Sequence, residues 1–118
     1  MCKEIYFTDK AVCGLSQKRD EIIALFDAYG GLLTQSCRDC IELYYCDDLS
    51  LSEIAEDVGI SRQGARDAIR RGEAELLHIE SVLGLVQKTG RISELAGEII
   101  AITDDADVKA IAERIIAL

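Results

Sequence analysis

The sequence has no proline and no tryptophan, and tyrosine and phenylalanine together make only six of its 118 residues. Alanine, leucine, isoleucine and glutamate are abundant instead, and these residues favour or readily accept helical backbone. No stretch alternates apolar and polar residues as a half-buried strand would. The composition therefore predicts an all-α fold.

Long hydrophobic runs are also missing. No apolar segment approaches the roughly 18–20 residues that a bilayer span requires, and the opening MCKEIYFTDK carries charges where a signal peptide would need an apolar stretch. We therefore expect a cytoplasmic protein with no membrane partner. In that compartment the five cysteines stay reduced, and their odd number prevents complete pairing.

The length and the charge limit the protein further. A chain of 13.0 kDa suits one domain with one modest core. Its formal charge of −9 opposes general affinity for nucleic acid or anionic lipid. The acids are concentrated, since residues 21–61 contain nine of them and one base.

Apolar spacing and capping residues predict a series of helices. They are expected over Gln17–Tyr29, Gln35–Cys46, Leu51 to Gly59, about six turns after Ser61, Ile92–Ile102 and Ala106–Ala117. The glycine at position 84 and the Thr89-Gly90 pair are expected to interrupt the chain between the fourth and fifth helices. We interpret residues 1–20 as a variable arm, 21–85 as the main domain and 86–118 as helices that pack on it or dimerise.

Residues 51–71 predict a helix-turn-helix. Ser50 and Glu53 form a capping-box pattern, Gly59 suits the left-handed end of the first helix, and Ser61 suits the cap of the second. Small Ala55 permits a close crossing. Further apolar residues are expected to fill the angle between the helices: Ile54, Val58, Ile60, Ala65 and Ala68. The same packing residues would also serve an ordinary αα-hairpin, so the exposed face has to distinguish the two.

That face is basic. Between positions 62 and 71 the chain has four arginines and one acid, and three of the arginines are spaced by four residues on one side of a helix. We expect Arg62, Gln63, Arg66 and Asp67 to reach base edges in double-stranded DNA. The expected phosphate contacts come from Ser61, Arg70 and Arg71. A merely solvated charged face is the alternative.

Several of these motifs occur in one known family. Leu32-Leu-Thr-Gln, Glu42-Leu-Tyr-Tyr, the segment from Asp48 to Glu56, and Ser61-Arg-Gln through Arg71 resemble the helix-turn-helix of region 4 in bacterial sigma factors. They are more closely similar to the YlxM family of small sigma-region-4-like proteins, over about residues 21–85. The resemblance implies an all-helical, winged-helix-like regulator without enzymatic activity, associated with the signal recognition particle pathway.

Two glycines depart from this pattern. Gly64 and Gly72 lie inside the predicted recognition helix, where each costs about 1 kcal/mol relative to alanine unless close packing requires it. The acidic residues 21–61 are a second departure, because they would oppose the approach of a polyanion.

No arrangement typical of an enzyme or a cofactor site is present in the sequence. Cys37 and Cys40 form a CxxC pair, but they fall within a predicted helix and lack a second pair at zinc spacing, so we expect buried apolar cysteines rather than a metal or redox site. His78 has no predicted partner for acid–base chemistry. We expect no cofactor and no catalytic residue.

The last third carries apolar stripes that need burial: Ile92, Leu95, Ile99, Ile102, Val108, Ile111 and Ile115. Folding back on the domain or pairing with a second copy would cover them, and we favour a homodimer. The leading hypothesis is therefore a sequence-selective nucleic-acid-binding regulator. The alternative is a non-enzymatic interaction module that binds a partner of the secretion machinery or its RNA.

Overall fold

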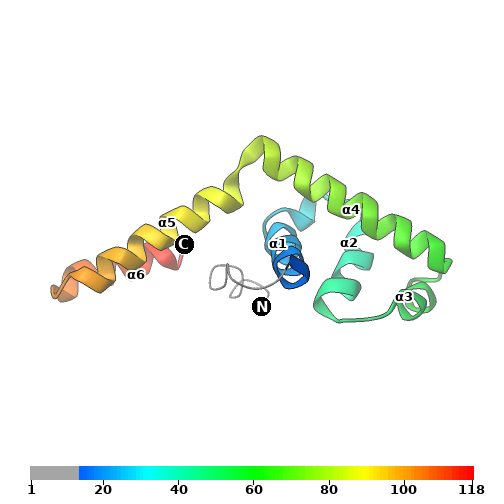
Figure 1. The fold of residues 1–118 in the computed structure, drawn as a ribbon, viewed down its shortest axis with the longest axis horizontal. Helices are drawn as coiled ribbons and strands as arrows, with labels where there is room; N and C mark the ends of the chain where they lie inside the picture. Colours follow the sequence, from blue (N-terminus) through cyan, green and yellow to red (C-terminus); the bar gives the residue numbers. More distant parts are fainter. Residues whose placement is uncertain (1–13) are drawn as a thin grey trace. The chain divides into compact units, whose positions relative to one another are not determined.

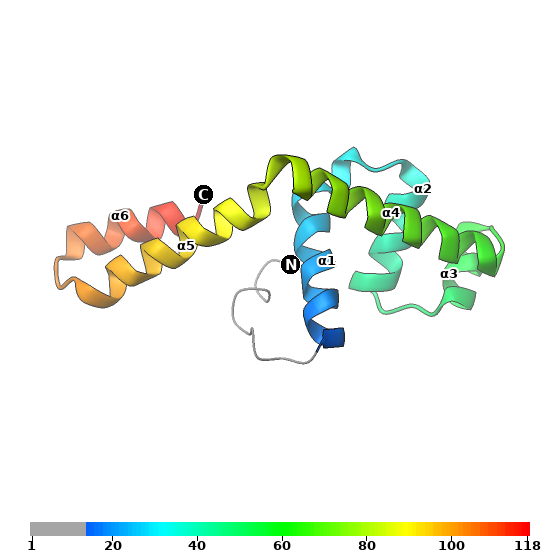
Figure 2. The same ribbon diagram turned by 45° about the horizontal axis from the view of Figure 1, so that its top comes forward.

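The computed structural model describes residues 14–118, with side chains from Lys18 onward. These residues form two compact units, one ending at Leu83 and one spanning Gly84–Leu118 (Figures 1 and 2). The first unit contains α1 (Gly14–Tyr29), the 3-10 turn η1 (Gly30–Leu32), α2 (Gln35–Ile41), the π-helix η2 (Glu42–Cys46), α3 (Leu51–Val58) and α4 (Arg62–Leu83). The second contains α5 (Leu85–Ile102) and α6 (Ala106–Ile116).

The all-α prediction is confirmed, because residues 14–118 contain helices and no strand. The described part of the chain therefore lacks a β wing, and the winged-helix expectation applies only to its helices. Helix α1 begins at Gly14, three residues before the expected start, so residues 14–20 of the segment interpreted as an arm are helical. The expectations for residues 1–13 fall outside the described residues.

The helix expected over Gln35–Cys46 changes type part-way. Thr34 caps its start as predicted, since the Thr34 side chain accepts from the Cys37 backbone N–H. After Ile41 the helix widens to π geometry, and the Asp47 N–H donates to the carbonyl five residues earlier at 3.2 Å. This turn leaves Tyr45 buried.

Both predicted ends of α3 are confirmed. The Glu53 N–H donates to the Ser50 hydroxyl at 3.2 Å, and the Ser50 N–H donates to the Glu53 carboxylate at 2.9 Å, which completes the capping box. These bonds lower the pKa of Glu53 from its ordinary value. Gly59 ends the helix with φ +80°, a left-handed conformation that glycine adopts without a steric cost.

The core lies where α4 packs across α1, α2 and α3 (Figures 1 and 2). Its largest members, including Ile22, Ile54 and Leu76, are fully buried, and the predicted core alanines of α4 are buried with them. The prediction for Ile60 is wrong. This side chain is 36% exposed, and its Cβ and Cδ1 lie beside Gly64 in the first turn of α4, so it does not fill the core as expected.

Gly72 is required by close packing. A Cβ atom at this position would overlap the Cδ1 of Ile41 and lie 3.1 Å from its Cγ1 and 3.4 Å from the Cys37 Cβ. Gly72, Ile41 and Cys37 are all buried, so α2 and α4 approach each other through the missing side chain. Gly64 differs, because its added Cβ would meet only the Ser61 hydroxyl at 3.1 Å and Ile60 at 3.8 Å or more.

The second unit is a helical hairpin in which α5 packs against α6 (Figures 1 and 2). Gly84 precedes α5 with φ +64°, as expected of an interruption. The interruption expected at Thr89-Gly90 is wrong, because α5 runs through both residues and Gly90 is buried within it. Asp105 caps α6 by accepting from the backbone at 107 and 108. No helix among the described residues is long and apolar enough to cross a membrane.

Candidate nucleic-acid interface

The turn between α3 and α4 fixes the start of the candidate interface. Gly59 reverses the chain, and the Ser61 hydroxyl then accepts from the Gly64 backbone N–H at 2.9 Å. Ser61 is thus the N-cap of α4, as predicted, and it remains exposed. A hydroxyl that accepts one bond still has its own hydrogen to donate to a ligand.

The seven residues predicted to contact nucleic acid are all exposed: Ser61, Arg62, Gln63, Arg66, Asp67, Arg70 and Arg71. The opposite side of the same turns of α4 carries Ala65, Ala68, Ile69 and Gly72, all buried against the other helices. Packing of this inner face therefore fixes which way the polar face points. At 100° per residue, Arg62, Arg66 and Arg70 form a row that drifts by about 40° per step.

The arginines of this face lack carboxylate partners among residues 14–118. None of the guanidinium groups of Arg62, Arg66, Arg70 and Arg71 makes an ion pair with a described residue, whereas Arg19 and Arg91 each make one. An unpaired exposed guanidinium keeps its donors and its charge available for an external anion. As far as residues 14–118 are concerned, this observation distinguishes the segment from a face neutralised by the protein's own carboxylates.

Three of the four acids of α4 are bonded to neutral donors instead. Asp67 accepts from the Gln63 side-chain amide at 3.0 Å rather than pairing with Arg66 or Arg71. Glu73 accepts from the Tyr45 hydroxyl, and Glu80 accepts from the Tyr29 hydroxyl at 2.5 Å. The two tyrosines are buried, so these two glutamates turn toward the core side of the helix.

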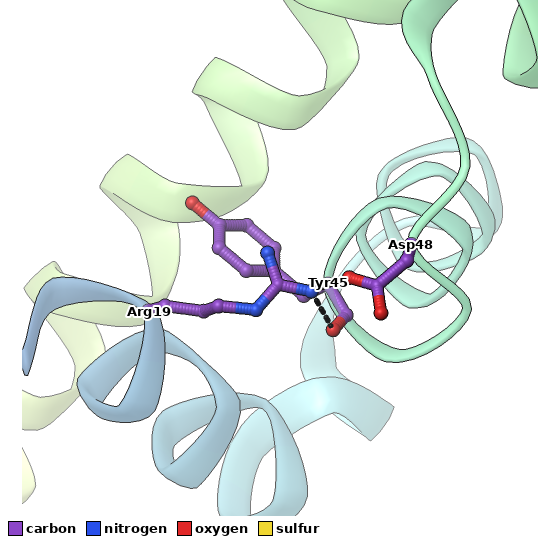
Figure 3. Close-up of polar contacts among 3 residues, drawn as sticks. All are labelled: Arg19, Tyr45 and Asp48. Atoms are coloured by element: carbon purple, nitrogen blue, oxygen red, sulfur yellow. Dashed lines mark hydrogen bonds and ion pairs between the residues drawn. The ribbon is translucent and has the colours of Figure 1, made fainter. Parts of the chain in front are cut away.

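Tyr45 is itself held by Arg19, a residue that sequence reasoning had placed in the arm. The Arg19 guanidinium lies 5.6 Å from the ring centroid of Tyr45, donates to the Tyr45 carbonyl at 2.7 Å and pairs with Asp48 (Figure 3). Burial, followed by the bond to Glu73, raises the pKa of the Tyr45 hydroxyl well above its usual value. Tyr45 therefore stays a hydrogen-bond donor at physiological pH.

The CxxC pair lies behind this interface. Cys37 and Cys40 are buried, as expected of cysteines that pack as small apolar residues. Burial raises the pKa of Cys40, with further contributions from Cys37 and Asp39, while Arg71 opposes the shift. A raised thiol pKa lowers the thiolate fraction and with it the reactivity of Cys40.

Comparison with known proteins agrees with this fold. A sequence model of the UPF0122 family, described as "Putative helix-turn-helix protein, YlxM / p13 like", matches residues 16–115. The chain belongs to this family. A UPF0122 protein of Symbiobacterium thermophilum is 42% identical over 97 residues, which cover 82% of this chain and 91% of that protein. A UPF0122 protein of Desulforamulus reducens is 44% identical over 84 residues, covering 71% and 72%.

A third relative is the UPF0122 protein of Halalkalibacterium halodurans, 42% identical over 94 residues that cover 80% of this chain and 84% of the relative. Membership in the UPF0122 family confirms the YlxM resemblance on which part of the sequence interpretation depends. It also extends the similarity from the helix-turn-helix into both helices of the second unit, since the family match continues to residue 115.

Proposed function

We propose that this UPF0122 protein is a non-catalytic regulator that binds double-stranded DNA through the first three turns of α4. The supporting observation is the row of exposed arginines, rigidly held by a buried inner face and lacking carboxylate partners among residues 14–118. Nucleic-acid phosphates and guanine edges are ligands that match the guanidinium fork. The family's description as a helix-turn-helix protein points the same way.

Within this proposal the residues divide into two groups. Arg62, Gln63, Arg66 and Asp67 occupy the first two turns, where a recognition helix reaches base edges. Ser61, Arg70 and Arg71 contact phosphates and set the register of the helix on the duplex. The Asp67 carboxylate, which accepts from the Gln63 side-chain amide, keeps further acceptor capacity that suits the exocyclic amine of cytosine.

We further propose that the active form is a homodimer joined through the second unit. Its two helices bury only Gly90, Ala96 and Ala112, and most of their large apolar residues are exposed. The exposed ones are Leu85, Ile92, Leu95, Ile99, Ile102, Val108, Ile111, Ile116 and Leu118. A second copy would cover these stripes and supply a second recognition helix for a paired half-site.

In-vitro selection from random duplexes at two salt concentrations tests the DNA proposal. We expect an enriched sequence that binds more weakly as salt rises, with log K falling by about 0.9 per phosphate neutralised. Arg62→Ala and Arg66→Ala should each cost about 1–3 kcal/mol and relax base preference. Arg70→Ala and Arg71→Ala should instead weaken binding to all duplexes alike and reduce the salt slope.

Arg91→Ala is the matched control, because it removes the same charge from α5 at a residue outside the predicted interface. It should leave the affinity near that of the wild type. The proposal fails if the four α4 variants bind the selected duplex as the wild type does, or if Arg91→Ala loses as much affinity as they do.

A second candidate function follows from the acidic side of the first unit. The carboxylates of Asp47, Asp48, Glu53, Glu56 and Asp57 are all exposed around α3, in a chain of net charge −9. Such a surface suits a basic protein or a ribonucleoprotein of the secretion machinery better than DNA. A pull-down should then recover the same partner with the Arg66→Ala variant. It should lose that partner with the double variant Glu56→Gln plus Asp57→Asn.

A further inference from the structure

The spacing of residues on α4 would allow one arginine of the row to form an ion pair. Glu73 lies three residues after Arg70, a spacing at which helical side chains are neighbours. The same order occurs on α5, where Arg91 and Glu94 do form an ion pair. The distance between the Arg91 Nη1 and the Glu94 Oε2 is 3.4 Å. Local helix geometry therefore permits the Arg70–Glu73 pair, but Glu73 is bound by a group outside α4 instead.

The difference between the two helices is Tyr45. Its hydroxyl donates to the Glu73 carboxylate from η2, and Glu73 is only partly exposed, while Arg70 faces solvent. Tyr45 cannot easily turn away, because Arg19 lies over its ring and binds its carbonyl, and Asp48 holds Arg19 in turn (Figure 3). A buried donor with little freedom holds its acceptor at a lower entropic cost than an exposed arginine does.

We propose that Tyr45 is a positioning residue for the candidate nucleic-acid interface: by binding Glu73, it keeps this carboxylate from neutralising Arg70. This inference rests on the proposed function for its consequence, and on the contacts of Tyr45 for its cause. When Tyr45 is intact, Arg70 meets a phosphate with its full charge. When the hydroxyl is removed, Glu73 is released to pair with Arg70, and the phosphate has to compete with it.

Tyr45→Phe tests the inference, because it removes the hydroxyl and keeps the ring that packs under Arg19. With a fluorescein-labelled duplex from the selection as the probe, anisotropy should show binding about two- to fivefold weaker, the range expected for one exposed ion pair. The salt slope should fall by up to about 0.9, since one phosphate contact is weakened. Tyr45→Phe combined with Glu73→Gln should restore both quantities, because the carboxylate that Tyr45 had held is then absent.

Tyr29→Phe is the matched control. It likewise removes a buried tyrosine hydroxyl that donates to a glutamate of α4, but Glu80 follows Arg71 by nine residues, about 14 Å along the helix axis. That separation exceeds the Debye length of about 8–10 Å at physiological salt. Binding and salt slope should therefore stay at the wild-type values, even if both tyrosine variants lose some thermal stability.

A second measurement needs no nucleic acid. In ¹H–¹⁵N spectra of the arginine side chains, the Nε–H of Arg70 should exchange with water more slowly in Tyr45→Phe than in the wild type. The added Glu73→Gln substitution should reverse this change. Equal exchange rates in the wild type and Tyr45→Phe would overturn the inference. Slower exchange without any duplex binding by the wild type would instead refute the proposed function, and weaker binding that Glu73→Gln fails to restore would assign Tyr45 a merely structural role.

Discussion

Gly64 and Gly72, both inside α4, should change the free energy of unfolding in opposite directions when each is replaced by alanine. The substitution gains about 1 kcal/mol of helix propensity at either site. At Gly72 the added methyl overlaps the Cδ1 of Ile41, which is fully buried and cannot swing into solvent. Overpacking a core costs about 1–3 kcal/mol, so after the gain in propensity we expect a net loss of about 0–2 kcal/mol in the free energy of unfolding.

Gly64→Ala meets much less resistance. Its nearest neighbour is the Ser61 hydroxyl at 3.1 Å, on an exposed residue that is able to shift by a few tenths of an ångström. We therefore expect a gain of about 0.5–1 kcal/mol from helix propensity. Urea denaturation followed by circular dichroism at 222 nm measures both changes, and the two melting temperatures should differ by several degrees in the same order.

A third variant isolates the atom responsible. Ile41→Val removes the overlapping Cδ1, so it should cost about 0.5–1.5 kcal/mol alone but much less in the Gly72→Ala background. Additive effects of the two substitutions would refute the packing argument. So would a Gly72→Ala protein as stable as Gly64→Ala, because the close approach of α2 and α4 would then not depend on the missing side chain.

Three further predictions concern local structure. Gly59→Ala should destabilise the protein by about 1–2 kcal/mol in urea denaturation, purely through its backbone, because the added methyl would touch nothing within 4 Å at φ +80°. Glu53→Gln should be less stable than the wild type above pH 4.5, the ordinary pKa of this carboxyl, and the difference should vanish as pH falls through the lowered folded value; a gap that persists under acid would contradict the capping-box assignment. In peptide-resolved maleimide labelling of the native protein, half-buried Cys46 should react before Cys40, whose burial and raised pKa protect it, whereas equal rates would show that α2 opens readily.

The capped elements were predictable because their signals are local. Ser50, Gly59 and Ser61 act on backbone groups within four residues, so the pattern of residue types determines both ends of α3 and the start of α4. The exposed arginine face followed from helical period for the same reason. Thr89-Gly90 was mispredicted because a glycine that is buried within a helix has the same local signature as one that ends it.

The contacts of the candidate interface divide in the same way. Sequence alone determined that α4 has an apolar side and a basic side, because a period of 3.6 residues orders its side chains whatever surrounds them. Only tertiary structure decided that Ile41 occupies the space where a side chain at Gly72 would lie. It also decided that Glu73 binds Tyr45 instead of Arg70. Those partners are at least 28 residues apart along the chain, and no local rule brings such distant groups together. The packing of α1, α2 and η2 on α4 places them in contact.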